Sequence, residues 1–303
     1  MRIDRPAEDD TPRAGPESRA ADTLPAAAHE SPDRVACAAG YKATVDAAYR
    51  EYRTTREWDE AVPALREAWE THQKKWTYPE RTEPTVHPDI PGAWRGDGGR
   101  YLTPDTNAEV TRGCARIREV GETVITPAIR RIEAEDPDRH LVGFEYRLKD
   151  PDRLKEKVAD DIRYKGRTPE EALGNVKDAI RFTFVYPEER YSAGVLADCE
   201  RLQASGFERF DRVNSWPEEQ YKGINSRWRE SDSGRLFEVQ FHTRASFEAK
   251  QLTHGAYERL RSPVTSDVER EELEDYQCAV SAKIPIPPGA TDIEGYRPEK
   301  RDG

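Results

Sequence analysis

The sequence predicts an α/β (α+β) protein, in which a mixed β-sheet is flanked by helices and preceded by a helical N-terminal extension. Segments with apolar residues three and four apart, typical of helices, alternate with short runs rich in β-branched and aromatic residues. Towards the C-terminal end, three such runs follow one another without a helix between them. This order is typical of a meander within a mixed sheet.

The composition limits the functions that the protein can have. Of its 303 residues 35% are charged and 35% hydrophobic, and the net charge is −11. This acidity argues against DNA or an anionic membrane as a partner. The four cysteines and six histidines show no zinc-site spacing, and no apolar run approaches the roughly 18 residues of a membrane span. Because no apolar signal core begins the chain, we expect a cytoplasmic protein; export by a system that reads no cleavable signal stays open.

Shifts in composition divide the chain into four parts. Residues 1–37 are acidic, rich in Pro and Ala and poor in large apolar side chains, so we expect a disordered tail. Residues 38–106 have the pattern of a helical extension and a Pro- and Gly-rich arm, in which GDGGR is only a weak phosphate-loop signal. Residues 107–287 carry the strand and helix patterns of the main domain, and 288–303 are expected to be an extended tail.

Each element is predicted by its own local pattern. Helices are expected at 38–73, 108–135, 190–205 and 246–261, and after the capping residues Asp150, Thr168 and Ser266. Strands are expected at 140–149, 176–186, 207–214, 225–230 and 235–243. Pro127 is expected to kink the helix at 108–135 or to begin its second half.

A basic segment joins the first strand to the next helix. Arg147 and Lys149 lie two apart at the end of the strand, and the Asp-Pro pair that follows begins a helix. Arg153 and Lys157 are four apart on that helix and share one face. We therefore expect four cations and a helix N-terminus around one spot, which suits a polyphosphate. On spacing alone, a solvated basic patch fits equally well.

Two acids are candidate metal ligands. Asp178 begins a very hydrophobic strand, where a charge is costly unless something binds it. Arg181 has the opposite strand parity, so we expect it to point to the other face and to serve structure. Glu238, Gln240 and His242 alternate in FEVQFHT and share one strand face. A carboxylate there would bind Mg²⁺ or accept the proton of an attacking hydroxyl.

Together these motifs resemble the synthetase domain of RelA/SpoT-type enzymes, the (p)ppGpp synthetases, over about residues 107–282. The basic segment is similar to the family's ATP-phosphate motif, and FEVQFHT to its Glu-x-Gln-x-Arg-Thr segment. QYKGINS is similar to the family's Gly-Tyr-Lys-Gly-Ile-His segment. The chain departs from the family at Arg153, Asn225 and His242, which stand where serine, histidine and arginine are usual. Asp178 also stands two residues closer than usual to the arginine that follows it.

The resemblance implies a nucleotidyltransferase-like fold and an ATP:nucleotide 3′-pyrophosphokinase, or GTP diphosphokinase-like enzyme. Such an enzyme transfers pyrophosphate from ATP to the 3′-hydroxyl of a purine nucleotide and releases AMP, as in (p)ppGpp or (p)ppApp synthesis. It implies ATP binding by Arg147, Lys149, Arg153 and Lys157. It implies catalysis and Mg²⁺ binding by Asp178 and Glu238. The residues implied for the acceptor nucleotide are Tyr221, whose ring would stack on the base, Lys222, Asn225, Gln240, His242, Glu248 and His254.

Other functions stay open at this point. The same fold suits a catalytically inactive nucleotide sensor, which the three departures favour. It also suits a stand-alone toxin that pyrophosphorylates an RNA 3′ end and has an antitoxin or immunity protein as partner. The acceptor, whether GDP, GTP or an adenine nucleotide, is not specified by the motifs. An ADP-ribosyltransferase is disfavoured, because the chain has Glu-x-Gln in place of Glu-x-Glu and no Ser-Thr-Ser strand. No hydrolase-type His-Asp pair is apparent, which predicts synthesis alone.

Overall fold

The computed structural model gives the structure of residues 55–76, 90–262 and 265–297. The described strands are β1 (Trp94–Gly96), β2 (Arg100–Leu102), β3 (His140–Val142), β4 (Arg181–Tyr186), β5 (Phe207–Asn214), β6 (Ile224–Glu230) and β7 (Leu236–Thr243). The described helices are α2 (Arg56–Lys75), α3 (Pro104–Val120), α4 (Thr126–Ala134), α5 (Pro151–Lys165), α6 (Pro169–Gly174), α7 (Tyr191–Ala204), α8 (Arg244–Leu260) and α9 (Asp267–Ser281). The tail expected at 1–37 lies outside the described residues. Within them, no helix is both long enough and apolar enough to cross a bilayer.

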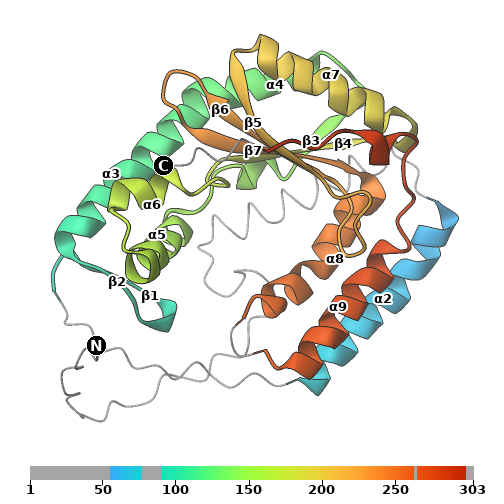
Figure 1. Cartoon of the computed structure of the whole chain (residues 1–303), viewed down its shortest axis with the longest axis horizontal. Helices are drawn as coiled ribbons and strands as arrows, with labels where there is room; N and C mark the ends of the chain where they lie inside the picture. Colours follow the sequence, from blue (N-terminus) through green and yellow to red (C-terminus); the bar gives the residue numbers. More distant parts are fainter. Residues whose placement is uncertain (1–54, 77–89, 263–264, 298–303) are drawn as a thin grey trace.

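The centre of the fold is a five-stranded mixed sheet in the order β3-β4-β7-β6-β5, so the predicted fold class is confirmed. β4 and β7 are parallel, and every other neighbouring pair in this sheet is antiparallel. Figure 1 shows α4 and α7 on one side of the sheet and α8 on the other. The side towards α7 is an aromatic core, in which Phe184, Tyr186 and Phe241 pack with ring centroids 6.2–6.3 Å apart.

The predicted strand at 140–149 is wrong beyond its first three residues. β3 ends at Val142, because Gly143 adopts a left-handed conformation with φ 63° and turns the chain. Phe144–Tyr146 is a 3-10 helix, and the chain rejoins the sheet after it, where the Arg147 carbonyl accepts from the Arg181 N–H at 2.7 Å and the Lys149 N–H donates to the Ala179 carbonyl at 2.9 Å. The alternation of large and polar residues in this segment therefore reflects a turn rather than a strand.

Two glycine and proline signals also have a structural explanation. GDGGR forms the turn between β1 and β2, with φ near 70° at Gly98 and Gly99, and this turn accounts for its glycines. The hairpin is fixed by Arg100, whose Nε donates to Asp160 on α5 at 2.8 Å. Pro127 stands in the first turn of α4, directly after a π-helical turn at Gly121–Ile125 that follows α3. It begins the second half of the helical segment, as one of the two expectations had it.

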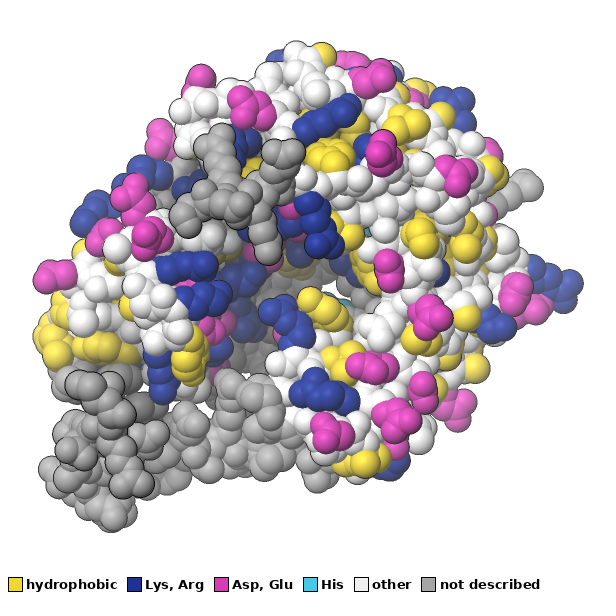
Figure 2. Space-filling model, in the orientation of Figure 1, with side chains coloured by type: hydrophobic (Ala, Val, Ile, Leu, Met, Phe, Trp, Pro, Cys, Tyr) yellow, Lys and Arg dark blue, Asp and Glu magenta, His cyan; other side chains and the backbone are white. Residues whose placement is uncertain are grey.

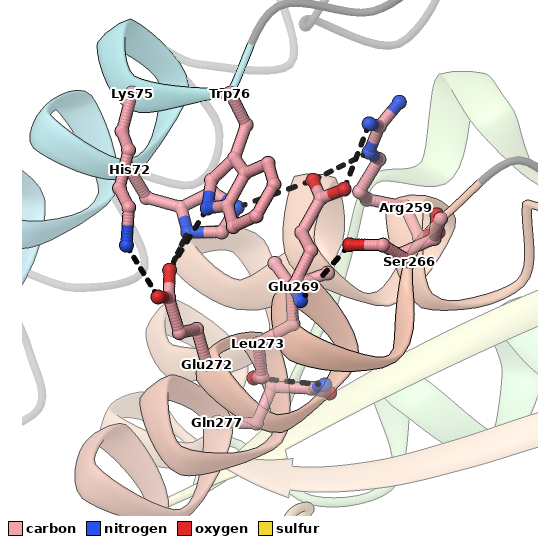
Figure 3. Close-up of polar contacts among 10 residues, drawn as sticks. His72, Lys75, Trp76, Arg259, Ser266, Glu269, Glu272, Leu273 and Gln277 are labelled. Carbon is pink, nitrogen blue, oxygen red and sulfur yellow. Dashed lines mark hydrogen bonds and ion pairs between the residues drawn. The ribbon is translucent and has the colours of Figure 1, made fainter.

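The N-terminal helix α2 lies along α8 and α9 (Figure 1). Figure 3 shows the polar contacts at one end of this packing, where the Trp76 Nε1 donates to Glu272 at 2.8 Å. His72 lies 3.5 Å from Glu269, which accepts a hydrogen bond from Arg259 at 2.7 Å. Burial lowers the pKa of His72, although the two glutamates act in the opposite direction. Helix α2 of the extension is thus packed against the helices that follow the sheet.

A buried charge network joins α7 to the start of β3. The side chains of Arg139 and Asp198 are both fully buried and lie 2.7 Å apart. Asp198 also accepts hydrogen bonds from the Tyr186 hydroxyl at 2.6 Å and from Arg201 at 2.8 Å. Removing one partner of such a pair leaves an uncompensated charge in the interior.

We therefore predict that Asp198→Ala lowers the free energy of unfolding by about 3–5 kcal/mol, measured by urea denaturation. The matched control is Asp138→Ala, which removes an aspartate–arginine pair of 3.3 Å in which both side chains are about half exposed. That control should cost about 0–1 kcal/mol. Equal losses in free energy of unfolding would contradict the prediction, because they would show that the buried network stabilises the fold no more than the exposed pair does.

Candidate functional site

The face of the sheet towards α8, which we call the site face, carries rows of polar side chains. The register places Arg181, Glu238 and Arg227 side by side on β4, β7 and β6. Because directly paired residues point to the same side of a sheet, these side chains share one face. The next polar row on this face consists of Thr183, Gln240 and Asn225. Figure 2 shows a hollow between the α5 side of the molecule and the α8–α9 side, with Lys and Arg side chains on its walls.

Asp178 lies at the edge of this face, between two lysines. Its Oδ1 is 2.8 Å from the Nζ of Lys157 on α5, and its Oδ2 is 3.1 Å from the Nζ of Lys149. Burial alone would raise the pKa of Asp178, but the two ammonium groups outweigh it and lower this pKa to about 2. Two of the four predicted cations thus converge on one spot, next to one of the two predicted carboxylates.

The other two cations lie elsewhere, so the prediction of four cations around one spot is wrong. Arg147 is turned towards the π-helical turn, where its Nη2 donates to Glu122 at 2.7 Å, and its guanidinium lies 4.2 Å from the centre of the Phe144 ring. The 3-10 turn that replaces the predicted strand causes this orientation. Arg153 is about half exposed on α5 and pairs with Glu156 at 3.0 Å.

Arg181 belongs to the site, contrary to the prediction that it points to the other face. Asp178 lies in a turn before β4, so the parity argument that compared the two residues does not apply. Arg181 stands beside Glu238 in the register, and its positive charge acts on the pKa values of Lys149, Tyr221 and Glu238. It therefore adds a cation to the middle of the site face.

A hydrogen-bonded chain links α8 to the candidate catalytic acid. The Lys250 Nζ donates to the Gln240 Oε1 at 2.5 Å, and the Gln240 Nε2 donates to the Glu238 Oε1 at 2.6 Å. Burial raises the pKa of Glu238, although the charges of Arg181 and Lys250 oppose this rise. Burial also lowers the pKa of Lys250, to about 7. The acid and the lysine are therefore both shifted towards neutral pH.

Tyr221 is held beside the same two strands. Its hydroxyl donates to the Asn225 Oδ1 at 3.2 Å and lies 2.9 Å from the His242 Nε2, while the His242 Nδ1 lies 2.9 Å from the Ser246 hydroxyl. His242 is fully buried, and burial lowers its pKa well below the usual range, so the imidazole is neutral. The structure thus brings three of the predicted acceptor residues into one hydrogen-bonded unit.

Two predicted acceptor residues have contacts outside the site face. The Lys222 Nζ donates to the carbonyl of Trp216 at 3.0 Å and fixes the loop before β6. Glu248 accepts a hydrogen bond from the Trp58 Nε1 at 2.7 Å and so joins α8 to α2. Both residues have the structural role of fastening neighbouring segments, which spacing within the sequence does not reveal.

His254 lies on α8 one turn beyond Lys250. Burial lowers its pKa, and the charges of Lys250, Arg181 and Lys149 lower it further, which places it near the site. Sequence reasoning missed Lys250 and Arg227. Lys250 could have been found from its spacing, because it lies four residues before the predicted site residue His254 and such residues share a helix face. Arg227 required the strand register, which the sequence does not specify.

The donor atoms of the site fit a magnesium ion that is shared with a ligand. Among the described residues, no group of three or more His, Cys, Asp and Glu side chains is arranged to hold a metal. Asp178 and Glu238 are close enough for their charges to interact. Mg²⁺ is commonly bound by one or two protein carboxylates together with water and substrate phosphates. Two carboxylates next to a lysine pair match this pattern.

No family model and no curated protein matches this chain. The chain is structurally similar to small alarmone synthetases. One similar structure is small alarmone synthetase 1 from Bacillus subtilis, with 14% identity over 59% of this chain and 92% of that chain, at a TM-score of 0.38. A second shows that enzyme bound to its product pppGpp, with 16% identity, 58% and 92% coverage and a TM-score of 0.39. A GTP pyrophosphokinase family protein from Streptococcus pneumoniae has 16% identity, 60% and 90% coverage and a TM-score of 0.41.

Gly223 allows the backbone to pass close to His242. A Cβ at this position would lie 2.8 Å from the His242 Cε1 and 3.3 Å from the Phe241 carbonyl oxygen, and φ is 152°. We predict that Gly223→Ala costs about 1–3 kcal/mol of stability, through overpacking and backbone strain, measured by urea denaturation. The control is Gly174→Ala, where no atom lies within 4 Å of the added Cβ and stability should be unchanged or slightly higher. A Gly223→Ala variant as stable as this control would contradict the close packing of His242.

Proposed function

We propose that this protein is a Mg²⁺-dependent ATP:nucleotide 3′-pyrophosphokinase. The observation that carries the proposal is the arrangement of Lys149, Asp178 and Lys157 next to Glu238, a carboxylate whose pKa is raised by burial. Lysine pairs suit phosphate, and a carboxylate with a raised pKa suits proton transfer near neutral pH. The sequence motifs at these positions support the same activity.

Lys149 and Lys157 bind the phosphates of ATP in this proposal. Asp178 holds their ammonium groups side by side, at 3.1 and 2.8 Å from its two oxygens. When phosphate oxygens take over these ammonium groups, the Asp178 carboxylate becomes available to Mg²⁺. Asp178 and Glu238 would hold the ion, which supplies neutralisation of the charge on the phosphates.

Glu238 acts as the general base. The 3′-hydroxyl oxygen of the acceptor forms a bond to the β-phosphorus of ATP, and its proton moves to the Glu238 carboxylate. The bond between the β-phosphorus and the oxygen that bridges it to the α-phosphate breaks, and AMP leaves. Gln240 holds the Glu238 carboxylate at 2.6 Å, and Arg181 supplies positive charge beside it. Tyr221 is placed to stack on the acceptor base, a role that the resemblance implies.

The test of the activity uses the full chain with γ-labelled ATP and Mg²⁺. GDP, GTP, an adenine nucleotide and an RNA with a free 3′-hydroxyl are offered one at a time, and products are separated by thin-layer chromatography. We expect label to move to a purine nucleotide, with one AMP formed for each product. Nucleotide binding by calorimetry without any transfer would favour the inactive sensor, and label on the RNA would favour the toxin alternative.

Lys149→Ala tests the phosphate contact. The loss of a charge-assisted hydrogen bond should weaken ATP binding by about 1.5–3 kcal/mol, measured by isothermal titration calorimetry. The control is Lys165→Ala on α5, which removes a lysine paired with Asp161 at 2.6 Å outside the site. Unchanged ATP affinity in Lys149→Ala would mean that this lysine is part of a surface ion pair only.

Glu238→Gln tests the general base. It keeps the shape and the hydrogen-bonding capacity of the side chain and removes the charge, so we expect normal folding and nucleotide binding. Product formation should fall by at least about a hundredfold, since general-base assistance contributes about 10²–10⁴ in rate. The control is Glu208→Gln on the exposed part of β5. Activity within about tenfold of the wild type is too small a loss for a general base and would exclude Glu238 from this role.

A further inference from the structure

One cation on the site face has no role in the transfer as described above. Lys250 extends from α8, and its Nζ donates to the Gln240 Oε1 at 2.5 Å. Among the described residues it forms no other hydrogen bond and no ion pair within 4 Å. Because an ammonium group has three donors, two of them stay open for a ligand.

A second cation with open donors lies beside it. Arg181 stands next to Glu238 in the register of β4 with β7, and its charge acts on the pKa of Lys250. Its guanidinium has no acceptor and no ion pair within 4 Å in the described part of the chain. Arg227, on the other side of Glu238, does have a partner, since its Nε donates to the Asp211 Oδ1 at 2.5 Å. The open donors around Glu238 therefore come from Lys250 and Arg181.

The charges of this pair favour an anion between them. Two cations repel each other, and Glu238, which carries the nearby negative charge, forms no ion pair with either within 4 Å. Burial and the charge of Arg181 lower the pKa of Lys250, and a bound phosphate would counteract this fall. Phosphate suits the donors as well, because the planar arginine fork matches two phosphate oxygens and an ammonium group binds a third.

Lys250 lies on the side of the site that carries the predicted acceptor residues. Ser246, Lys250 and His254 are spaced by four on α8 and share one face. The Ser246 hydroxyl is 2.9 Å from the His242 Nδ1, and the His242 Nε2 is 2.9 Å from the Tyr221 hydroxyl. Lys250 is therefore one helical turn from the unit that holds Tyr221.

The phosphates of ATP have a different place in the proposed function. Of the two lysines that bind them there, Lys157 belongs to α5. Figure 2 shows the hollow between the α5 side and the α8–α9 side of the molecule. Phosphate donors thus come from both walls of this hollow, and the α8 wall is the one that carries Lys250.

We propose that Lys250 and Arg181 form a second phosphate-binding position, which takes the 5′-phosphate groups of the acceptor nucleotide. This inference rests on the proposed function, because it deepens the acceptor side of the same site. The lysine pair around Asp178 then holds the donor, and Lys250 holds the acceptor from the opposite wall. The charge of Arg181 acts on Lys149 as well as on Lys250, so Arg181 lies near both positions and Lys250 distinguishes them.

The binding test measures acceptor affinity while the donor position is filled. The full chain is saturated with Mg²⁺ and an ATP analogue in which a methylene group replaces the oxygen between the α- and β-phosphates, so no transfer occurs. GDP, ADP, guanosine and adenosine are then titrated by calorimetry. We expect Lys250→Met to weaken binding of the preferred diphosphate by about 10- to 100-fold, the loss of one charge-assisted hydrogen bond. Its affinity for the matching nucleoside and for the ATP analogue should be unchanged.

Two further variants serve as controls. Lys165→Met removes a lysine on α5 that is paired with Asp161 outside the site, and it should leave every affinity unchanged. Lys250→Arg keeps the charge and should restore part of the diphosphate affinity. Urea denaturation shows whether Lys250→Met folds. If it does not, Lys250→Gln, which keeps a polar group beside Gln240, gives the same comparison.

Three results would overturn the inference. The first is equal diphosphate affinity in Lys250→Met and the wild type. The second is an equal loss for the diphosphate and its nucleoside, because Lys250 would then act on the site as a whole rather than on phosphate. The third is a wild type that binds neither diphosphate while the ATP analogue is bound.

A kinetic readout separates this inference from the proposed function. In the transfer reaction, Lys250→Met should raise the KM of the acceptor about 10- to 100-fold, more than it lowers kcat, and leave the KM of ATP unchanged. A phosphate-dependent loss of binding in a protein that transfers no pyrophosphate would support the second phosphate position and reject the enzyme. An active enzyme whose acceptor affinity does not depend on Lys250 would reject the position and retain the enzyme.

Discussion

The parallel pairing of β4 with β7 is the constraint on which the site depends. It sets Arg181 beside Glu238 and Thr183 beside Gln240. Thr183 and Gln240 are 57 positions apart in the sequence. β7 passes directly into α8, because the Thr243 side chain caps the first turn of that helix by accepting from the Ser246 N–H at 3.2 Å. α8 consequently folds back over the same face that β4 and β7 create, and brings Lys250 with it.

Burial and opposite charge act against each other throughout this site. Asp178 keeps its negative charge because two lysines outweigh burial, whereas burial dominates for Glu238 and for Lys250 and moves their pKa values towards each other. Pairs of titratable groups whose surroundings shift their pKa values are typical of catalytic sites. An anionic ligand near Lys149 would change this balance, because it adds negative charge beside Asp178.

The sequence allowed the prediction of most helices and strands, because their periods and caps are local. It also brought Lys149, Lys157, Asp178, Glu238, Gln240, Tyr221, Asn225 and His242 to attention through their spacing. It did not predict where Arg147 points, because a period of two does not reveal the left-handed turn at Gly143 that ends β3. Nor did it predict the partner of Glu248, which it assigned to the acceptor. That partner, Trp58, lies 190 residues away on α2, so no local pattern reveals the contact. Contacts of this kind depend on the assembled fold, and the register that places Arg227 beside Glu238 does so as well.

The departures from the family pattern differ in what they touch. Arg153 lies on an exposed part of α5 and pairs with Glu156, outside the lysine cluster. Asn225 and His242 both bond to the hydroxyl of Tyr221, at 3.2 and 2.9 Å. These two residues share one hydrogen-bonded unit, which Ser246 completes at 2.9 Å from the His242 Nδ1. Because buried polar groups need hydrogen-bond partners, both departures are accommodated by the fold, and together they hold the Tyr221 hydroxyl in place.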